Sequence, residues 1–477
     1  MIRRSTLFLC CLLLACPTLA FGQTWTGGGD GVTWEDPANW DSNPALPSGN
    51  TNITDLANVS LSSSQTINEL DIVGDQSAGT AVLNHTAGTL SGGGWLKVGV
   101  DGGNNGTYNL SGTAVTTGYT QVHAGARNGD GVVNLSGTSS LTHSQSVRLA
   151  DDGANTLGTG TLNLSDSATI NTGDDWAIGT VGTGVVNLSD NSVANVADRV
   201  NIGFNGTGTL NIDDNATLNA RLLALGNGTG TSTVNMTGGS VTTNDWIAIG
   251  QGGSAGPSSY NQSGGVVDVN GDWLTIGENG TGTYNVSSSS VVDAIDANGI
   301  LVGRNGSSIG LLEVTGSNAA ISGAELRIGL RSQGDDTGAN GEISWIADAN
   351  GVTTVVSQDS TSFGMNADLT VDLTADTAFS TWTTTPTGAS LVDIAVLIDN
   401  VNNVSSGIAA STQMFAGQAE GSLVDIGGGQ QAFLTYNGGA DGNDIVLQAF
   451  ITAIPEPTSA TILALAGMGM MCRRRRN

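Results

Sequence analysis

The chain contains 477 residues, of which 71 are glycine and 12% are charged, and its formal net charge at pH 7 is −28. Hydrophobic residues make up 38% of the chain. They are mostly Val, Ile and Leu in short alternating runs, a pattern that excludes long amphipathic helices and favours strands joined by turns. So acidic a surface argues against nucleic acid and anionic lipid as partners.

The first 22 residues have the three regions of an export signal. Arg3 and Arg4 precede an apolar stretch from Leu7 to Ala15, and a small-x-small cleavage site ends at Gly22. The segment predicts export from the cytoplasm, with cleavage before Gln23.

The four cysteines all lie near the ends of the chain. Cys10, Cys11 and Cys16 belong to the export signal and Cys472 lies in the tail, so the exported domain is expected to contain no disulfide bond. Its stability must come from stacked strands and buried aliphatic side chains. Lipidation of Cys16 stays open as an alternative to cleavage downstream, because Leu13–Cys16 resembles a lipoprotein box.

Residues 23–65 are expected to form an N-terminal cap, because the first strand edge of a β-domain has to be covered. The segment is rich in aromatic and proline residues, namely Trp25, Trp34, Trp40, Pro37, Pro44 and Pro47.

A repeat of about two dozen residues follows this segment. Gly160–Gly179 reads GTLNLSDSATINTGDDWAIG and Gly184–Gly203 reads GVVNLSDNSVANVADRVNIG, so these two segments are copies of one unit. An asparagine at a fixed place marks each copy. These anchors are Asn84, Asn109, Asn134, Asn163, Asn187, Asn211, Asn235, Asn261 and Asn285.

Each unit is predicted to supply two strands, one around the asparagine and a closing one, such as Ile247–Ile249, that ends at a glycine. A unit this short cannot bury its own apolar face, so successive units must stack with like strands paired in parallel. We therefore predict an all-β fold, a parallel β-solenoid (β-helix) of about ten coils over residues 66–345. About ten coils at the interstrand spacing make a rod of roughly 50 Å.

The alternation of the first strand separates a polar face from an apolar one. If Leu162 and Leu164 point inward, then Thr161, Asn163 and Ser165 point outward. Equivalent residues of other units would stack beside them as a regular polar lattice, namely Asn187, Asn211, Asn235 and Asn285. Two interpretations stay open: a solvated face with hydrogen-bonded asparagine ladders, or a repetitive surface that binds glycan chains or ice.

No catalytic or metal-binding residues are expected in the repeats. His85, His123 and His143 lie at different phases of the unit, which predicts positions at corners or on the surface. A polysaccharide-active β-helix enzyme remains an alternative on fold analogy. Such an enzyme needs a base beside clustered acids, and the domain offers one lysine, Lys97, and scattered arginines.

Acidic residues recur just before three tryptophans, Trp176, Trp246 and Trp273. Recurrence at one phase favours a structural role at the coil corners. If these rings are exposed, they are an alternative platform for sugar stacking.

Residues 346–453 lose the period, and strand-like runs there predict a C-terminal β cap region. The runs are Leu369–Leu373, Leu391–Ile398 and Ile445–Phe450. Asp441 and Asp444 lie in a string similar to calcium-binding nonapeptides, which act in tandem, whereas this string is single. We expect no cofactor, with calcium as the open alternative.

Residues 454–477 resemble the PEP-CTERM sorting signal. Its parts are Pro455, Glu456 and Pro457, an apolar span from Thr461 to Met471, and the cluster Arg473, Arg474, Arg475 and Arg476. The resemblance implies processing by an exosortase-like enzyme. The apolar span is expected to form a short C-terminal transmembrane helix, although it falls below the ~20 residues that cross a bilayer comfortably. The arginines would stay on the cytoplasmic side.

The repeats, over roughly residues 79–345, are similar to the autotransporter-associated β-strand repeats of bacterial surface proteins. The segments Trp25–Asp41 and Tyr436–Leu447 also resemble the ends of such proteins. We expect an exported structural or adhesive component of the cell surface or extracellular matrix, and no enzyme. Its partners would be exopolysaccharide or other surface glycans, and its tail would hold it transiently in the inner membrane.

Overall fold

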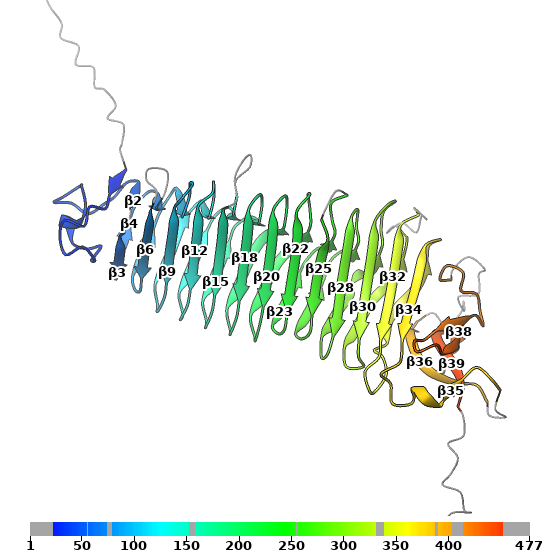
Figure 1. The fold of residues 1–477 in the computed structure, drawn as a ribbon. Helices are drawn as coiled ribbons and strands as arrows, with labels where there is room; N and C mark the ends of the chain where they lie inside the picture. Colours follow the sequence, from blue (N-terminus) through cyan, green and yellow to red (C-terminus); the bar gives the residue numbers. More distant parts are fainter. Residues whose placement is uncertain are drawn as a thin grey trace, which may run out of the picture.

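The computed structural model describes residues 22–451, except 55, 74–78, 152–157, 254–255, 331–337, 387–389 and 403–413. The chain forms an elongated rod of stacked coils that advances in chain order from one end to the other (Figure 1). The predicted all-β parallel β-solenoid is confirmed. Helix in the described residues is limited to two short 3₁₀ turns, η1 (Pro37–Asn39) and η2 (Phe379–Thr381).

Three strand segments per coil build three parallel faces along the rod. Face 1 is a 13-stranded sheet that carries the repeat asparagines. Its strands are β3 (Asn58–Leu61), β6 (Thr80–His85), β9 (Asn105–Leu110), β12 (Asp130–Leu135), β15 (Thr159–Leu164), β18 (Thr183–Leu188), β20 (Thr207–Ile212), β22 (Thr231–Met236), β25 (Ser258–Gln262), β28 (Thr281–Ser287), β30 (Ile309–Thr315), β32 (Asn340–Ile346) and β34 (Ala367–Asp372).

Faces 2 and 3 belong to one 26-stranded sheet, because some strands run around the corner between them. Face 2 contains β4 (Gln65–Thr66), β7 (Thr89–Ser91), β10 (Val115–Tyr119), β13 (Ser140–His143), β16 (Thr169–Thr172), β23 (Ser240–Thr243) and β26 (Val266–Val269). Face 3 contains β1 (Gln23–Thr24), β2 (Thr51–Ile53), β5 (Leu70–Ile72), β8 (Trp95–Val98), β11 (Gln121–Ala124), β14 (Val147–Leu149), β17 (Trp176–Ile178), β24 (Ile247–Ile249) and β27 (Trp273–Ile276). The strands shared by both faces are β19 (Val193–Ile202), β21 (Thr217–Leu225), β29 (Val291–Val302), β31 (Ala320–Ile328) and β33 (Val355–Phe363).

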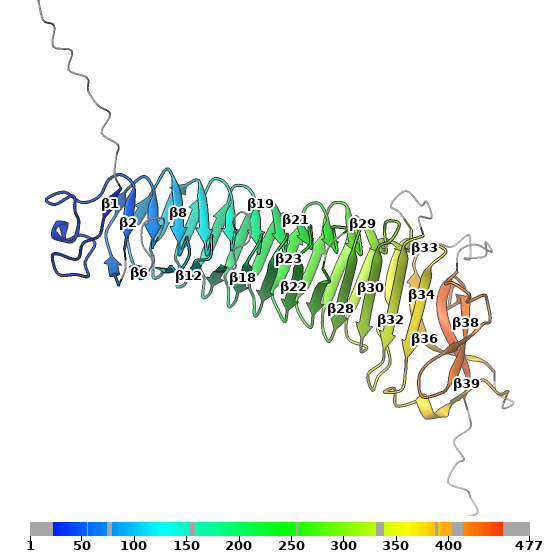
Figure 2. The ribbon, with the colours of Figure 1, turned by 45° about the horizontal axis from the view of Figure 1, so that its top comes forward.

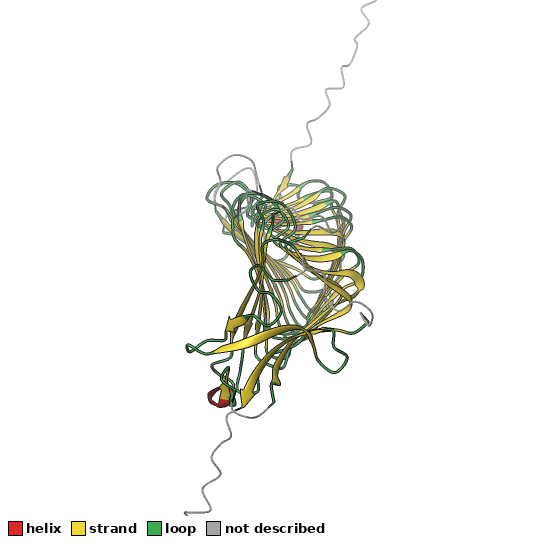
Figure 3. Ribbon diagram, turned by 90° about the vertical axis from the view of Figure 1, so that its right-hand side faces the viewer, coloured by secondary structure: helices red, strands yellow, loops and turns green. Residues whose placement is uncertain are grey.

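Figure 2 shows strands of faces 1 and 3 along the rod, and the end-on view in Figure 3 shows strands as walls with loops at the corners. The two predicted strands of each unit are present, and the segment between them, which was not predicted as a strand, is a third one. In β16 it spans four residues, Thr169–Thr172. So short a segment, rich in Thr and Asn on its outer side, resembles a turn in the sequence.

Like residues of successive coils lie side by side in register. Asn163 pairs with Asn134 and Asn187, and Leu164 pairs with Leu188. Leu162, Leu164 and Leu188 are each 1% exposed, so the aliphatic residues of face 1 share one interior. Burial of each such side chain contributes about 1.5–3 kcal/mol.

The rod has about thirteen turns, so the predicted count of about ten coils was wrong. Parallel pairing already begins between β1 and β2, before residue 66, and continues to the pair of β33 and β36, after residue 345. Glu313, Ser344 and Thr370 take the place of the marker asparagine in the last coils. The same inward packing therefore persists where the visible motif is lost.

Corner geometry explains why a glycine closes each unit. Gly179, between β17 and β18, has a φ of +70°, a left-handed conformation that residues with a side chain adopt at a cost. Gly208 faces inward on β20, where an added Cβ would lie 2.6 Å from the carbonyl oxygen of Ile178 in the preceding coil. Glycine therefore sets how closely the coils approach at this corner.

The N-terminal segment covers the first edge of face 1. The backbone N–H of Trp34 donates to the carbonyl oxygen of Ser60 on β3, and the N–H of Ser60 donates to the carbonyl oxygen of Val32. Trp25 and Trp40 pack edge-to-face with ring centroids 4.9 Å apart, and Trp34 lies 4.7 Å from Trp40. An aromatic cluster thus closes the rod where unpaired strand groups would otherwise be exposed.

An antiparallel sheet covers the other end. It contains β35 (Trp382–Thr383), β36 (Val392–Asn400), β37 (Leu423–Asp425), β38 (Gln431–Gly438) and β39 (Asp444–Ile451). β36 continues the parallel pairing from β33 and then pairs antiparallel with β39. The N–H of Ala416 donates to the carbonyl oxygen of Ala367 on β34, so the last strand of face 1 is also covered.

In the part of the chain that the structure describes, no helix has the length and apolarity to cross a membrane. The transmembrane helix predicted in 454–477 lies outside the described residues, as does the signal segment up to residue 21.

Candidate functional site

A continuous ladder of asparagine side chains runs along the outer surface of face 1. From Asn109 to Asn285, the Nδ2 of each marker asparagine donates to the Oδ1 of the marker in the preceding coil, at 2.7–3.0 Å. At the N-terminal end, the Nδ2 of Asn84 donates to the Oδ1 of Asn58. We call this column, Asn84 to Asn285, the Asn ladder.

The predicted lattice residues all lie on this surface. Asn163 is half-buried between Thr161 and Ser165, while Leu162 and Leu164 point inward. Asn187, Asn211, Asn235 and Asn285 belong to the same ladder. Each amide has two N–H groups and two acceptor lone pairs. One donor and one acceptor site serve the ladder, so half of each amide's capacity is not used by the ladder itself.

The Asn ladder surface is almost free of charge. The eight strands of face 1 from β9 to β28 contain a single charged residue, Asp130. Residues 24–454 nevertheless carry 41 of the 42 acidic and 8 of the 14 basic residues, a formal net charge of −33. Most acids therefore lie on turns, on the other faces and at the C-terminal end of face 1, and the part of face 1 from β9 to β28 presents amides and hydroxyls.

Acidic residues serve the turns between faces 1 and 2. Asp166, Asp190 and Asp214 adopt a left-handed conformation, with φ values of 58°, 58° and 55°. The carboxylate of Asp190 accepts from the backbone N–H of Asp166, and that of Asp214 accepts from the N–H of Asp190. These carboxylates tie each turn to the preceding one, which is a structural role.

Two adjoining hollows lie beside the C-terminal part of the Asn ladder. The first has a volume of about 200 Å³ and is lined by Asn235, Met236, Thr237, Asn261, Gln262, Ser263, Asn285 and Ser287. The second has a volume of about 640 Å³ and is lined by Ser287, Ser288, Ser289, Thr315, Gly316, Ser317, Asn318 and Asp348. Ser287 lines both, so the two hollows adjoin, and we call them together the hydroxyl groove.

A shorter asparagine column occurs on face 2. Asn195 donates to Asn171, and Asn219 donates to Asn195, each at 2.9 Å. A hollow of about 220 Å³ borders this column next to Arg221, whose guanidinium forms ion pairs with Asp198 and Asp245 in the neighbouring coils. Repeated amide stacking is thus a general device of this rod.

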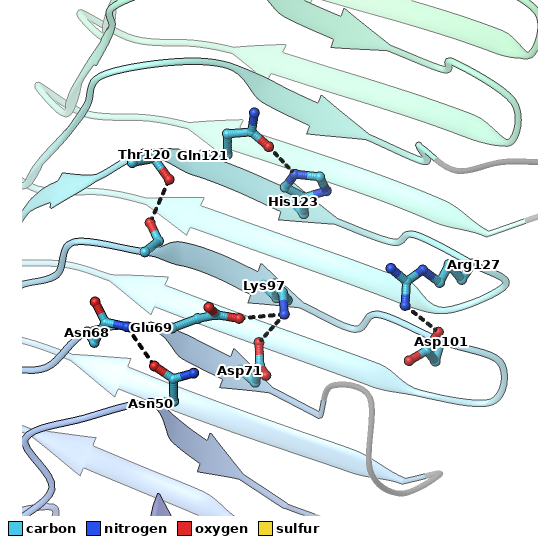
Figure 4. A network of polar contacts seen from close by, with 11 residues as sticks. Asn50, Asn68, Glu69, Asp71, Lys97, Asp101, Thr120, Gln121, His123 and Arg127 are labelled. Carbon is cyan, nitrogen blue, oxygen red and sulfur yellow. Dashed lines mark hydrogen bonds and ion pairs between the residues drawn. The ribbon is translucent and has the colours of Figure 1, made fainter. Parts of the chain in front are cut away.

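Lys97 lies in a network of polar residues on face 3 (Figure 4). Its ammonium pairs with Glu69 and lies 3.5 Å from Asp71, both in the preceding coil. On the same face, His123 stacks on Trp95 with ring centroids 4.9 Å apart, and its Nε2 lies 2.8 Å from the Gln121 side chain. The lysine therefore joins coils through ion pairs.

The three repeat tryptophans do not occupy one phase. Trp176 pairs in register with Val200, an inward position, and is 0% exposed. Trp246 and Trp273 precede the inward residues Ile247 and Leu274. The sequence already indicated this difference in phase. Trp176 lies three residues before the glycine that closes its unit, whereas Trp246 and Trp273 each lie four residues before theirs. Trp273 is 5% exposed, so neither it nor Trp176 is a platform for sugars.

Two of the three histidines lie in the interior, so their predicted placement at corners or on the surface was wrong. His85 is 0% exposed at the inward position that Leu110 fills in the next coil, and its Nδ1 lies 3.0 Å from the Tyr108 hydroxyl. His143 is 3% exposed, with its Nε2 3.0 Å from the Thr172 hydroxyl. The sequence did indicate the burial of His85, because His85 directly follows the marker Asn84, at the place where other units have an inward aliphatic residue.

The buried histidines are expected to make the rod sensitive to acid. Burial lowers the pKa of His85 and of His143 to about 4, whereas the unfolded chain titrates near 6.5. Because the unfolded state binds protons first as the pH falls, stability is full above about pH 6.5 and declines between about pH 6.5 and 4. The loss amounts to at most about 3 kcal/mol for each histidine.

Urea unfolding near pH 7 and near pH 4.5 measures this effect. The double variant His85→Gln/His143→Gln should lose most of the pH dependence over that interval. The matched change His123→Gln, on the outer side of face 3, should retain it. An unchanged pH dependence in the double variant would exclude the two rings as its source.

Asp444, singled out as a possible calcium ligand, has a structural contact. Its carboxylate accepts from the backbone N–H of Asn400 at 3.1 Å, and burial raises its pKa. Within the described ranges, no three His, Cys, Asp or Glu side chains group as metal ligands.

The sorting residues Pro455, Glu456, Pro457 and Arg473–Arg476 lie outside the described residues. No family model matches the chain, and no curated protein and no solved structure matches it either.

Proposed function

We propose that the chain is an exported structural or adhesive protein of the cell surface or extracellular matrix, in which the solenoid acts as a capped spacer rod. The observation that carries this proposal is the unbroken Asn ladder over a shared aliphatic interior, closed at both ends. Each coil is tied to the next by backbone pairing, aliphatic packing and side-chain amides together. Such a quasi-one-dimensional stack holds its two ends at a fixed separation.

Covered ends support a discrete rod. The aromatic cluster of Trp25, Trp34 and Trp40 closes one end, and the antiparallel sheet of β36 to β39 closes the other. Unpaired parallel strands at either end would template pairing between copies. A rod closed in this way extends over a set distance and displays its faces sideways.

The sorting tail supports export to the surface. In the proposal, the export signal directs the chain across the inner membrane, and Pro455–Pro457 with Arg473–Arg476 hold it there until an exosortase-like enzyme acts. The chain then reaches the cell envelope or the extracellular matrix. No nucleic acid partner is proposed, given the net charge of −33 over residues 24–454.

Mass spectrometry of the surface-associated protein from its own host tests this proposal. We expect a product that begins at Gln23 and lacks Arg473–Arg476. The double variant Pro455→Ala/Pro457→Ala should retain the tail and stay with the membrane fraction. The matched variant Thr458→Ala/Ser459→Ala should be processed normally. A surface product with the intact arginine cluster would refute the sorting step.

A further inference from the structure

We propose that the hydroxyl groove beside the Asn ladder binds a neutral polysaccharide chain that lies along the rod. The inference deepens the proposed function and rests on it, since it names the matrix component that a surface rod would hold. It depends on the composition of the groove, on its charge and on the order of its side chains.

The groove lies beside turns between faces 1 and 2 that are built from small residues. The turns after β15, β18 and β20 carry Asp166, Asp190 and Asp214, whereas the turn after β22 contains Gly238–Gly239 and the turn after β25 contains Gly264–Gly265. Ser288 and Ser289 occupy the next turn and line the second hollow. The two hollows thus lie beside these turns, next to the last amides of the Asn ladder.

The trough has the dimensions of a chain-binding site. It extends over the coils of β22, β25, β28, β30 and β32. Five adjacent strands at the interstrand spacing span about 20 Å. A linear chain of sugars laid parallel to the rod axis would meet an amide and a hydroxyl at each of the first four of these coils.

Its donors and acceptors suit sugar hydroxyls. Asn235, Asn261 and Asn285 present amides whose rotamers the Asn ladder already fixes. Thr237, Ser263 and Ser287 add hydroxyls along the turn edge. Ordered side chains lose little conformational entropy on binding, so a repeated array of weak contacts can add up along a chain.

The charge of the groove selects a neutral ligand. No basic residue lines either hollow, and Asp348 is the one acidic residue in their linings. Hydrogen bonds from the backbone N–H of Asn350 and from Ser317 lower the pKa of Asp348, which keeps it charged. With a net charge of −33 around it, the groove disfavours uronic acid or sulfated chains by repulsion.

Retention of the mature exported chain on insoluble polysaccharides tests the proposal. The neutral probes are cellulose, chitin, starch and curdlan, and the anionic probes are calcium alginate and polygalacturonate beads. We expect retention on at least one neutral polysaccharide and none on the anionic beads. Retention should survive high salt, because no ion pair contributes to it.

A matched pair of double variants locates the site. Ser263→Ile/Ser287→Ile fills the groove, whereas Ser259→Ile/Thr283→Ile places the same bulk in the same two coils, on the far side of the Asn ladder. The groove variant should lose at least tenfold in retention, and the control should match the wild type. Circular dichroism melting of both variants verifies that the rod is intact.

Three results would overturn the proposal. These are no retention on any neutral polysaccharide, equal loss in the two double variants, or preference for the anionic beads. Shaping of ice crystals without retention on a polysaccharide would assign the surface to ice and also overturn it. Cell fractionation of the groove variant separates this failure from that of the proposed function, because surface sorting depends on the tail.

Discussion

Replacing Trp40 by alanine is expected to lower the free energy of unfolding of the N-terminal coils by about 3–5 kcal/mol. Trp40 is 1% exposed, and its rings pack against Trp25 and Trp34 at centroid distances of 4.9 and 4.7 Å. Its Nε1 also donates to the carbonyl oxygen of Trp34 at 2.8 Å. The change removes the tryptophan that contacts both other members of the cluster covering the edge of β3.

Hydrogen exchange measured by mass spectrometry checks this expectation. Amides of β3 and β6 should exchange markedly faster in Trp40→Ala, while those of β28 and β30 keep their protection, because a solenoid couples mainly nearest neighbours. The matched control is Trp95→Ala on face 3, where the ring is 39% exposed. Equal exchange in the two variants would contradict the capping role of Trp40.

Replacing Leu188 by alanine in the middle of the rod should cost about 2–5 kcal/mol. Leu188 is 1% exposed and pairs in register with Leu164 and Ile212 of the adjacent coils. The cavity would border three coils. The loss of stability should therefore extend to the two adjacent coils, although their sequences are unchanged. Urea unfolding gives the magnitude, and hydrogen exchange gives its extent along the chain.

Val185→Ala is the matched control for Leu188→Ala, because Val185 lies on the same strand, β18, but on the outer surface. Its truncation should cost less than about 1 kcal/mol. A similar loss of stability in the two variants would mean that the two sides of β18 are equally buried, against the alternation on which face 1 depends.

The alternation of Leu162, Asn163 and Leu164 was sufficient to predict the strand, its parallel stacking and the outward direction of the asparagine. That inference holds because a strand has period two and because a single coil cannot bury its apolar side. The coil count was less predictable. Glu313, Ser344 and Thr370 replace the marker at the C-terminal end, where burial alone maintains the stacking.

The burial of two histidines was missed. His85 and His143 were predicted at corners or on the surface because they lie at different phases of the unit, yet each occupies an inward position near a hydroxyl, that of Tyr108 or Thr172. A buried polar side chain is tolerated when it is hydrogen-bonded. The register of His85 with Leu110 was therefore the better indication of burial.

The hydroxyl groove could not be inferred from the repeat pattern. The groove is formed by several turns that are adjacent only in the folded rod. In the sequence, each of these turns has the Gly and Ser residues that are common in turns. Only the stacked coils show that hollows border the turns after β22, β25 and β28 next to the Asn ladder.

The central claim is that like strands of successive coils stack at a constant spacing along one rod. Residues 23–471 contain no cysteine, so a Ser111→Cys/Ser287→Cys variant of these residues can be spin-labelled specifically at two outer positions of face 1. Seven strand steps separate β9 from β28. Double electron–electron resonance should give one narrow distance near 34 Å, at ~4.8 Å per step. A broad distribution, or a mean shorter than ~25 Å, would contradict the stacked rod.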